Sequence, residues 1–190
     1  SFGYTLPKDK FRQPYIARQV RVTIPIHLAP LSWASFQLVE GQVDYRDGIY
    51  QNGVIDTPFV TVSVDEGITV YDKTTNEAYE DFIQFEDRGD IGNEYIYFQP
   101  KGTEPIYAQL KGYEVLENNA RYAKVLLKHD LTIPVSADEK LDAEQRGIIE
   151  FMNRDAGRSE EVTTIPLETV MTVFVDDPQI RFKTSFTNTA

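Results

Sequence analysis

The sequence has 190 residues, of which 30 are acidic and 19 basic, giving a formal net charge of −11. A chain of this length can bury one substantial hydrophobic core and is expected to form a single domain. Its negative charge argues against nucleic acid and anionic lipid surfaces as partners. The absence of cysteine excludes disulfides, thiolate metal sites and cysteine nucleophiles.

The compartment is predicted from what the sequence lacks. It has no cysteine, no apolar run as long as a membrane span and, at its start, no signal-peptide pattern. These features predict a cytoplasmic protein without a membrane segment. Because the sequence begins without methionine and stops soon after a strand pattern, we expect both ends to lie within a longer chain.

The first strand is predicted within residues 18–28. Residues 1–17 contain Pro7 and Pro14 and have no periodicity, so we expect an irregular lead-in there and a single β-sandwich domain over residues 18–190. From residue 20, apolar residues alternate with polar ones, which indicates a strand with one buried face. The apolar positions of this strand are Val20, Val22, Ile24, Ile26 and Leu28.

Turn dipeptides and glycines then mark hairpins. Asp47-Gly48 and Asn52-Gly53 are turn dipeptides, and the segment between them is predicted as a short hairpin region. Residues 57–64 and 68–71 have strand character on either side of a three-residue turn, in which Gly67 supplies the positive φ that such a turn needs.

Most of the second half is also predicted as strands. The predicted ranges are 95–98, 113–115, 121–135, 165–175 and 180–186. One helix is predicted at residues 138–153, because Ser136 and Glu139 have capping-box spacing and apolar residues recur at helical intervals. Regular strands with almost no helix predict an all-β fold, an antiparallel β-sandwich with one short helix.

The two histidines are the candidate imidazole ligands of the chain. His27 lies on the polar face of its predicted strand, and His129 shares a face with Leu127 and Leu131. A histidine on an apolar strand face is more often a hydrogen-bonded core residue than a metal ligand. No His-x-x-x-His pair, Gly-x-Ser-x-Gly elbow or phosphate-binding glycine loop occurs. The residues therefore indicate no metal site, no cofactor and no catalytic motif.

The strongest candidate site is the loop at residues 85–98, which is rich in carboxylates, glycine and aromatic residues. One interpretation is structural, because Asp and Asn side chains close turns and glycines allow special backbone angles. The other is carbohydrate binding, because carboxylates and amides bind sugar hydroxyls and a tyrosine ring covers an apolar sugar face. The candidate substrate-binding residues are Asp87, Asp90, Asn93, Glu94 and Tyr95.

Two segments of the chain resemble glycoside hydrolase family 38 in its bacterial branch. They are residues 60–76, which contain an Asp-Lys pair, and residues 85–95, which contain the pattern Gly-Asp-x-Gly-Asn-x-Tyr. Residues 22–36 resemble the segment that precedes the large β-domain of that family, and residues 179–190 resemble a strand ending in Asn-Thr-Ala. By this resemblance the chain is identified as part of the C-terminal β-region of an α-mannosidase.

The resemblance implies a supersandwich of the galactose-mutarotase type, within a zinc-dependent retaining enzyme that hydrolyses mannose-containing glycans. Zinc ligands and the Asp nucleophile of such enzymes lie in an N-terminal α/β domain, so we expect none of them in this chain. By position, Tyr95 matches the tyrosine with which the family's β-region reaches the mannose site. The implied partners are the saccharide and, in the same polypeptide, the catalytic and helical domains.

Two other functions remain open on the sequence. An independent sugar-binding or adhesive β-sandwich would use exposed members of the 11 tyrosines and 11 phenylalanines as stacking platforms. A self-sufficient acid/base glycosidase would use two of the carboxylates between Asp87 and Glu94, but it needs a formed cleft and a fixed separation of the two groups. We expect instead a non-catalytic domain that completes one wall of a substrate cleft.

Overall fold

The computed structural model describes residues 2–5, 13–16, 22, 24, 26–37, 39, 41 and 47–189, and the structural statements below concern these residues. Contacts divide the chain into two units, residues 1–43 and residues 44–190. The first unit contains an antiparallel pair, β1 (Phe2–Thr5) and β2 (Gln13–Ile16), where no regular structure was expected. All other named elements belong to the second unit, which we call the β-body.

The strand predicted at residues 20–28 is not formed at the positions that the structure describes there, and the remaining ones lie outside the described residues. An alternating sequence becomes a strand only where neighbouring strands pair with it and cover its apolar face. The sheet of the first unit contains β1 and β2 alone. The exposed apolar residues of this segment are Val22, Ile24, Ile26 and Leu28. The start of the predicted domain at residue 18 stays a prediction.

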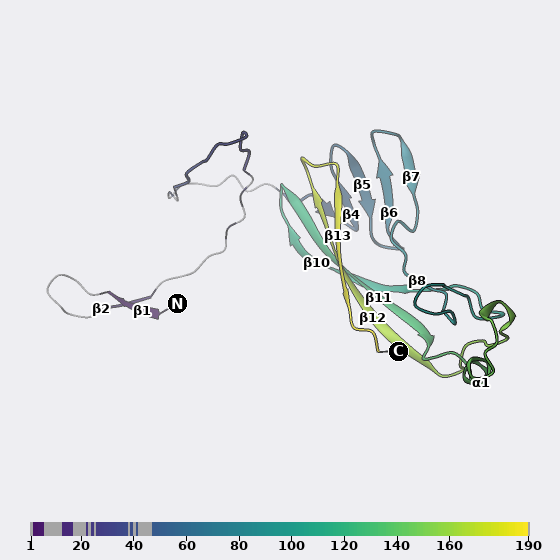
Figure 1. Ribbon diagram of the computed structural model, residues 1–190. Helices are drawn as coiled ribbons and strands as arrows, with labels where there is room; N and C mark the ends of the chain where they lie inside the picture. The colour runs from purple at the N-terminus through teal and green to yellow at the C-terminus, as the bar shows by residue number, and fades with distance from the viewer. Residues whose placement is uncertain are drawn as a thin grey trace. The chain divides into compact units, whose positions relative to one another are not determined.

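A five-stranded antiparallel sheet in sequential order forms the first layer of the β-body (Figure 1). Asn52 and Gly53 have φ values of 47° and 80° and form a two-residue turn at the predicted dipeptide, with a backbone twist that matches the flanking strands. The hairpin joins the first two strands of this sheet and so lies later in the chain than the segment predicted between Gly48 and Asn52. Gly67, with φ of 131°, lies in the predicted turn between the third and fourth strands. The strands are β3 (Tyr50–Gln51), β4 (Val54–Asp56), β5 (Val60–Ser63), β6 (Thr69–Asp72) and β7 (Glu77–Tyr79).

A four-stranded antiparallel sheet forms the second layer, and here the strand predictions are confirmed. β11 and β12 pair without interruption, from Tyr122 opposite Phe174 to Pro134 opposite Val162. Buried and more exposed residues alternate along both strands, so each presents one face to the interior. The four strands are β10 (Gln109–Asn118), β11 (Tyr122–Pro134), β12 (Val162–Phe174) and β13 (Ile180–Phe186).

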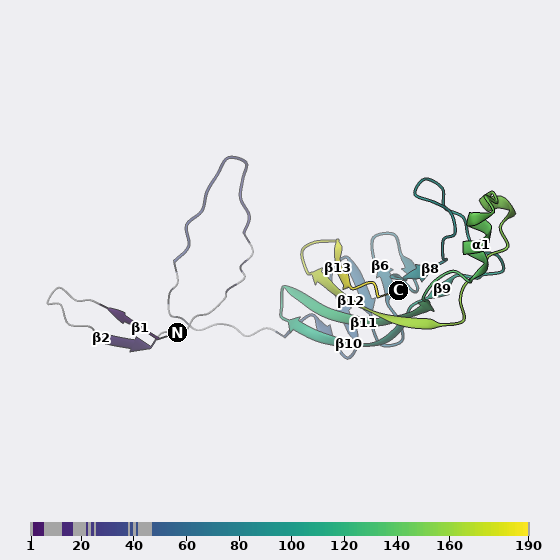
Figure 2. The ribbon, with the colours of Figure 1, turned by 60° about the horizontal axis from the view of Figure 1, so that its bottom comes forward.

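The long strands β11 and β12 contribute to two hydrophobic cores. Their 122–127 and 169–174 ends pack with β4, β5 and β6 to form the larger core, between the two layers seen in Figure 2. Their opposite ends contribute Leu131, Ile133, Ile165 and Leu167 to a smaller core. That core packs against residues next to the short pair β8 (Glu86–Asp87) and β9 (Ile106–Tyr107). The antiparallel all-β sandwich predicted from the sequence is confirmed.

The predicted helix is shorter than expected and begins differently. α1 spans Lys140–Arg146, and a 3-10 helix follows at Phe151–Asn153. The predicted capping box is wrong, because the hydroxyl of Ser136 donates to the carbonyl of Ala137 and Asp138 Oδ1 accepts from the Lys140 N–H at 3.0 Å. Within the part of the chain that the structure describes, no helix is long and apolar enough to cross a membrane.

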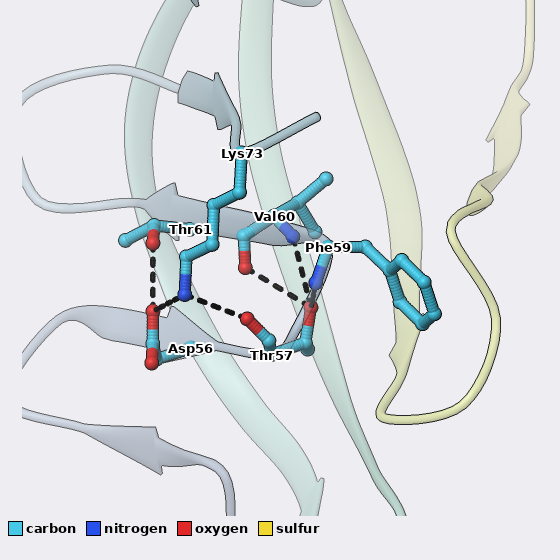
Figure 3. Close-up of polar contacts among 6 residues, drawn as sticks. All are labelled: Asp56, Thr57, Phe59, Val60, Thr61 and Lys73. Atoms are coloured by element: carbon cyan, nitrogen blue, oxygen red, sulfur yellow. Dashed lines mark hydrogen bonds and ion pairs between the residues drawn. The ribbon is translucent and has the colours of Figure 1, made fainter. Parts of the chain in front are cut away.

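Lys73 fixes the turn between β4 and β5, as Figure 3 shows. Its Nζ donates to Asp56 Oδ1 at 2.7 Å and to the carbonyl oxygen of Thr57 at 2.6 Å. Thr61 donates to the same carboxylate oxygen at 2.7 Å, and the Thr57 hydroxyl exchanges hydrogen bonds with the Val60 backbone. Hydrogen bonding to Lys73 lowers the pKa of Asp56. The Asp-Lys segment of the family resemblance is therefore used to hold the sheet together.

His129 lies on the inner face of β11 and is only 5% exposed. Its ring meets the Phe85 ring edge-on, with the centroids 5.3 Å apart, and its Nδ1 has no hydrogen-bond partner among the described residues. Burial lowers the pKa of His129 from its ordinary value of 6.5. The histidine thus packs as a buried core residue.

We predict that His129 makes the β-body less stable in mild acid. The unfolded chain binds a proton at His129 more readily than the folded chain does, so stability is lost as the pH falls from above 6.5 toward the lower folded-state pKa. His129→Leu, measured by urea unfolding at pH 7.5 and pH 5.5, should lose less stability between the two than the wild type. His27→Leu is the control, because His27 is exposed. Equal losses in the His129→Leu and wild-type chains would contradict the prediction.

Candidate functional site

The loop between β8 and β9 contains most of the predicted site residues, and it is folded back on itself. The Ile91 N–H donates to the Phe98 carbonyl at 2.8 Å, and the Asn93 N–H donates to the Ile96 carbonyl at 3.0 Å. Ile91 is 2% exposed and anchors the base of the loop. The strand predicted at 95–98 is therefore wrong, since none of these residues is in a strand and the carbonyls of Ile96 and Phe98 accept from the loop's own backbone.

Asp90 and Asn93 close the turns of this loop with their side chains. Asp90 Oδ1 accepts from the backbone N–H groups of Gly92 and Phe98, at 2.8 and 3.0 Å. Asn93 Oδ1 accepts from the N–H groups of Tyr95 and Ile96, at 2.9 and 3.0 Å. These are the side-chain-to-backbone bonds of Asx turns. The structural interpretation of these two residues accounts for every hydrogen bond seen at their side chains.

Two glycines are required by the loop for different reasons. Gly89 has φ of 67°, and a side chain there would also approach Pro100 and Arg158 closely. At Gly92 a Cβ would lie 1.8 Å from the Ile96 carbonyl oxygen, so the constraint is the close approach of two backbone segments. Because the backbone turns tightly at both glycines, the residues that follow Gly92 lie at the tip of the loop.

Glu94 and Tyr95 lie at this tip and are both exposed. Tyr95 is 86% exposed, and within the described chain neither its hydroxyl nor the Glu94 carboxylate has a hydrogen-bond partner. A phenol ring and a carboxylate in this state are available to a ligand that has both an apolar face and hydroxyl groups. Of the five predicted site residues, these two are exposed and have side chains that bond no other described residue.

Asp87 lies in β8 and forms an ion pair with Arg158. The side chains of Asp87 and Arg158 are 24% and 10% exposed, so the pair is largely removed from water. Both residues line a hollow of about 230 Å³ together with Asp90 and Asn188. The Asp87 carboxylate is therefore held by a cation at the root of the loop and does not extend to the tip.

Arg154 connects the loop to the segment that follows α1. Its Nη1 donates to the Ile91 carbonyl at 2.5 Å, and its Nε donates to the Ile149 carbonyl at 3.2 Å. This segment carries Ile148, 89% exposed, and Met152, 67% exposed. Both residues lie within the helix predicted at 138–153, but α1 ends at Arg146 and Ile148 has φ of 57°. The apolar residues therefore face solvent beside the candidate loop.

Carboxylates hold the base of this region in place. Glu144 of α1 accepts from the N–H groups of Asp155 and Ala156 at 2.7 and 3.2 Å, and Asp138 accepts from the Gly157 N–H at 3.0 Å. Lys101 pairs with the carboxylate of Asp155. The backbone of the loop and the segment after α1 are thus tied to one frame, which fixes the direction in which the tip points.

Metal binding is not supported in the described part of the β-body. An acidic hollow of about 490 Å³ has Asp65, Glu66, Glu80 and Asp81 in its lining. Nevertheless, no group of three or more His, Asp or Glu side chains among the described residues is arranged to hold a metal ion. The zinc that the family resemblance implies stays a prediction for the catalytic domain outside this chain.

The start of the chain is similar to a known protein family. Residues 1–40 match the family described as glycosyl hydrolases family 38 C-terminal domain 1. The match ends three residues before the division between the two units, after residue 43. The relationship of the β-body itself therefore depends on whole-chain comparisons.

One relative and two solved structures extend the similarity along the chain. A protein of Halalkalibacterium halodurans named "Putative mannosylglycerate hydrolase" is 32% identical over 203 residues, covering 100% of this chain and 22% of its own. The crystal structure of an alpha-mannosidase from Enterococcus faecalis V583 is 30% identical, with a TM-score of 0.73, covering 99% and 22%. A family 38 protein from the same species is also 30% identical, with a TM-score of 0.71, covering 77% and 18%. The chain thus spans about a fifth of the length of these relatives.

We predict that the Asp87–Arg158 pair stabilises the root of the loop. Asp87→Asn should destabilise the chain by about 2 kcal/mol, because it leaves the largely buried Arg158 charge without its counterion. Asp142→Asn is the matched control, since it breaks the exposed pair with Arg146 and should cost less than about 0.5 kcal/mol. Both values come from urea unfolding at pH 7. Equal effects of the two substitutions would show that the buried pair has no special role.

Proposed function

We propose that this chain belongs to glycoside hydrolase family 38 and forms one wall of the substrate cleft in a mannoside-hydrolysing enzyme. The relatives with which it aligns are glycoside hydrolases by name, which supports a hydrolase as the whole protein. The observation that carries the proposal is the exposure of Tyr95 and Glu94 at the tip of a braced loop.

The tip has the chemistry of a sugar contact. The phenol ring of Tyr95 offers a flat apolar surface to the C–H face of a pyranose, and its hydroxyl can donate to or accept from a sugar hydroxyl. The Glu94 carboxylate next to it accepts hydrogen bonds from hydroxyl groups. The loop that carries this surface is stabilised by the turns of Asp90 and Asn93 and, at its root, by the ion pair of Asp87.

The bond-breaking chemistry is assigned to another part of the protein. Zinc and the nucleophile of a retaining mechanism belong, in this proposal, to a catalytic domain outside this chain. The contribution of this chain is to contact the substrate, orient it and keep water away from one side. The exposed Ile148 and Met152 are suited to pack against the catalytic or helical domain beside the cleft.

The substrate class is a mannose-containing saccharide. The two named activities among the relatives, mannosylglycerate hydrolase and alpha-mannosidase, both act on a mannosyl group. A tip with one tyrosine and one carboxylate favours hydroxyl groups over a further anion. The tip therefore favours a neutral mannosyl group at Tyr95. An anionic aglycone, such as that of a mannosylglycerate, would be bound elsewhere.

The contact is tested by Tyr95→Phe in the whole protein. Losing a hydroxyl that bonds the sugar should lower kcat/KM for a chromogenic α-mannoside about threefold to tenfold. Tyr95→Ala, which also removes the ring, should lower it further. Tyr71→Phe is the control, because Tyr71 is a partly exposed tyrosine of the five-stranded sheet that bonds Asn76. Unchanged kinetics in both Tyr95 variants would exclude the cleft-wall role.

The 190-residue chain alone distinguishes this function from an independent sugar-binding module. We expect no release of chromophore from an α-mannoside and no saturable binding of mannobiose below about 10 mM, because a single tyrosine and carboxylate bury too little of a sugar. Titration calorimetry measures the binding. Saturable binding by the isolated chain would favour the module, and hydrolysis by it would overturn the assignment of the chemistry to another domain.

A further inference from the structure

We propose that the flank of the β-body between β7 and β13 receives a further β-strand from the same polypeptide, paired with β13. This proposal rests on the family relationship but not on the proposed cleft contact. β7 and β13 are edge strands of their respective sheets. They lie on the same side of the sandwich, because the Phe82 ring after β7 packs on Phe182 of β13 with centroids 6.0 Å apart.

Aromatic side chains on this flank point inward and yet remain exposed. Residues directly opposite each other on adjacent strands point to the same face of the sheet. Tyr79 is opposite Val70, which is 4% exposed, but Tyr79 itself is 42% exposed. Phe186 is opposite Leu167, also 4% exposed, but is 61% exposed. In both sheets, therefore, inward-facing side chains of the edge strand are left partly uncovered.

The opposite flank, between β3 and β10, is closed. Tyr50 and Tyr113 also face inward, but their hydroxyls meet at 3.1 Å and their rings pack edge-on. Tyr113 donates to Asp65 at 2.6 Å, which raises the pKa of Tyr113. The Asn118 amide accepts from the Tyr50 N–H at 3.0 Å and donates to its carbonyl at 2.9 Å, as a neighbouring strand would. At the β7/β13 flank the Phe82 ring packs on Phe182 and on Tyr79, but no hydrogen bond among the described residues joins the two sheets there.

A strand of the same polypeptide fits this flank better than a second copy of the chain does. Antiparallel self-pairing of β13 about its centre would place Lys183 opposite its own copy, and like charges directly opposite are destabilising. The aligned relatives have about four-fifths of their length outside this region, which can supply a strand. The added strand should alternate, with apolar residues covering Phe186 and a polar or acidic residue near Lys183.

Single cysteines test the coverage, since the chain itself has none. Tyr79→Cys and Phe186→Cys report on the flank, and Tyr71→Cys reports on the outer face of the neighbouring strand β6, where Tyr71 is 38% exposed. Thiol labelling rates are compared between the 190-residue chain and the whole protein with its other cysteines replaced by serine. We expect both flank positions to react at least tenfold more slowly in the whole protein, and the Tyr71→Cys rate to change less than threefold.

Hydrogen exchange then separates strand pairing from simple covering. An edge strand has alternate N–H groups directed away from its neighbour, and pairing protects them. Exchange over residues 180–186 should slow at least tenfold in the whole protein relative to the chain. Unchanged labelling at Tyr79→Cys and Phe186→Cys, or unchanged exchange of β13, would overturn the proposal. Concentration-dependent protection of the isolated chain would assign the flank to a second copy and overturn it as well.

These measurements are independent of sugar turnover. A whole protein with a protected flank and unaltered kinetics in the Tyr95 variants would retain the strand proposal and lose only the cleft wall. Slowed turnover in those variants with an unprotected flank would retain the cleft wall and lose the strand proposal.

Discussion

The uninterrupted pairing of β11 with β12 is the constraint on which the rest of the β-body depends. Thirteen consecutive residues of each strand are in register, so a single row of inward side chains runs the length of the sheet. A slip of one residue would turn this whole row to solvent. Burial of the row in two successive cores fixes the register at both ends and joins the five-stranded sheet to the loop region.

This arrangement separates the stabilising part of the molecule from the part that is offered to a ligand. The larger core holds both sheets together, and the smaller core supports β8 and β9, between which the candidate loop extends. Polar residues of the loop are used in its own turns, and those of the segment after α1 brace it from outside. A contact surface made from few residues can then be rigid, because its support comes from neighbours that do not touch the ligand.

The candidate site could be located from the sequence but not resolved. The dense run of Asp, Gly, Asn and Tyr residues identified the loop, and local turn chemistry accounts for Asp90 and Asn93. No neighbouring residue in the sequence indicated the different role of Asp87, because its partner Arg158 is 71 positions away and the two are brought together by the fold. The exposure of Ile148 and Met152 was missed because helical spacing predicted one helix over 138–153, but α1 ends at Arg146.

The sequence by itself determined the all-β class, the strands β10 to β13 and the Asn52-Gly53 and Gly67 turns, because alternation and turn chemistry act over a few residues. It did not determine which alternating segments are covered. Residues 22–28 alternate in sequence as well as β13 does, yet β13 pairs with β12 and none of the described positions among 22–28 is in a strand. Tertiary structure decided that outcome. It also decided the closed β3/β10 flank, the open β7/β13 flank and the ion pair at the loop root. Pairing and burial depend on partners far away in the sequence, which no local pattern encodes.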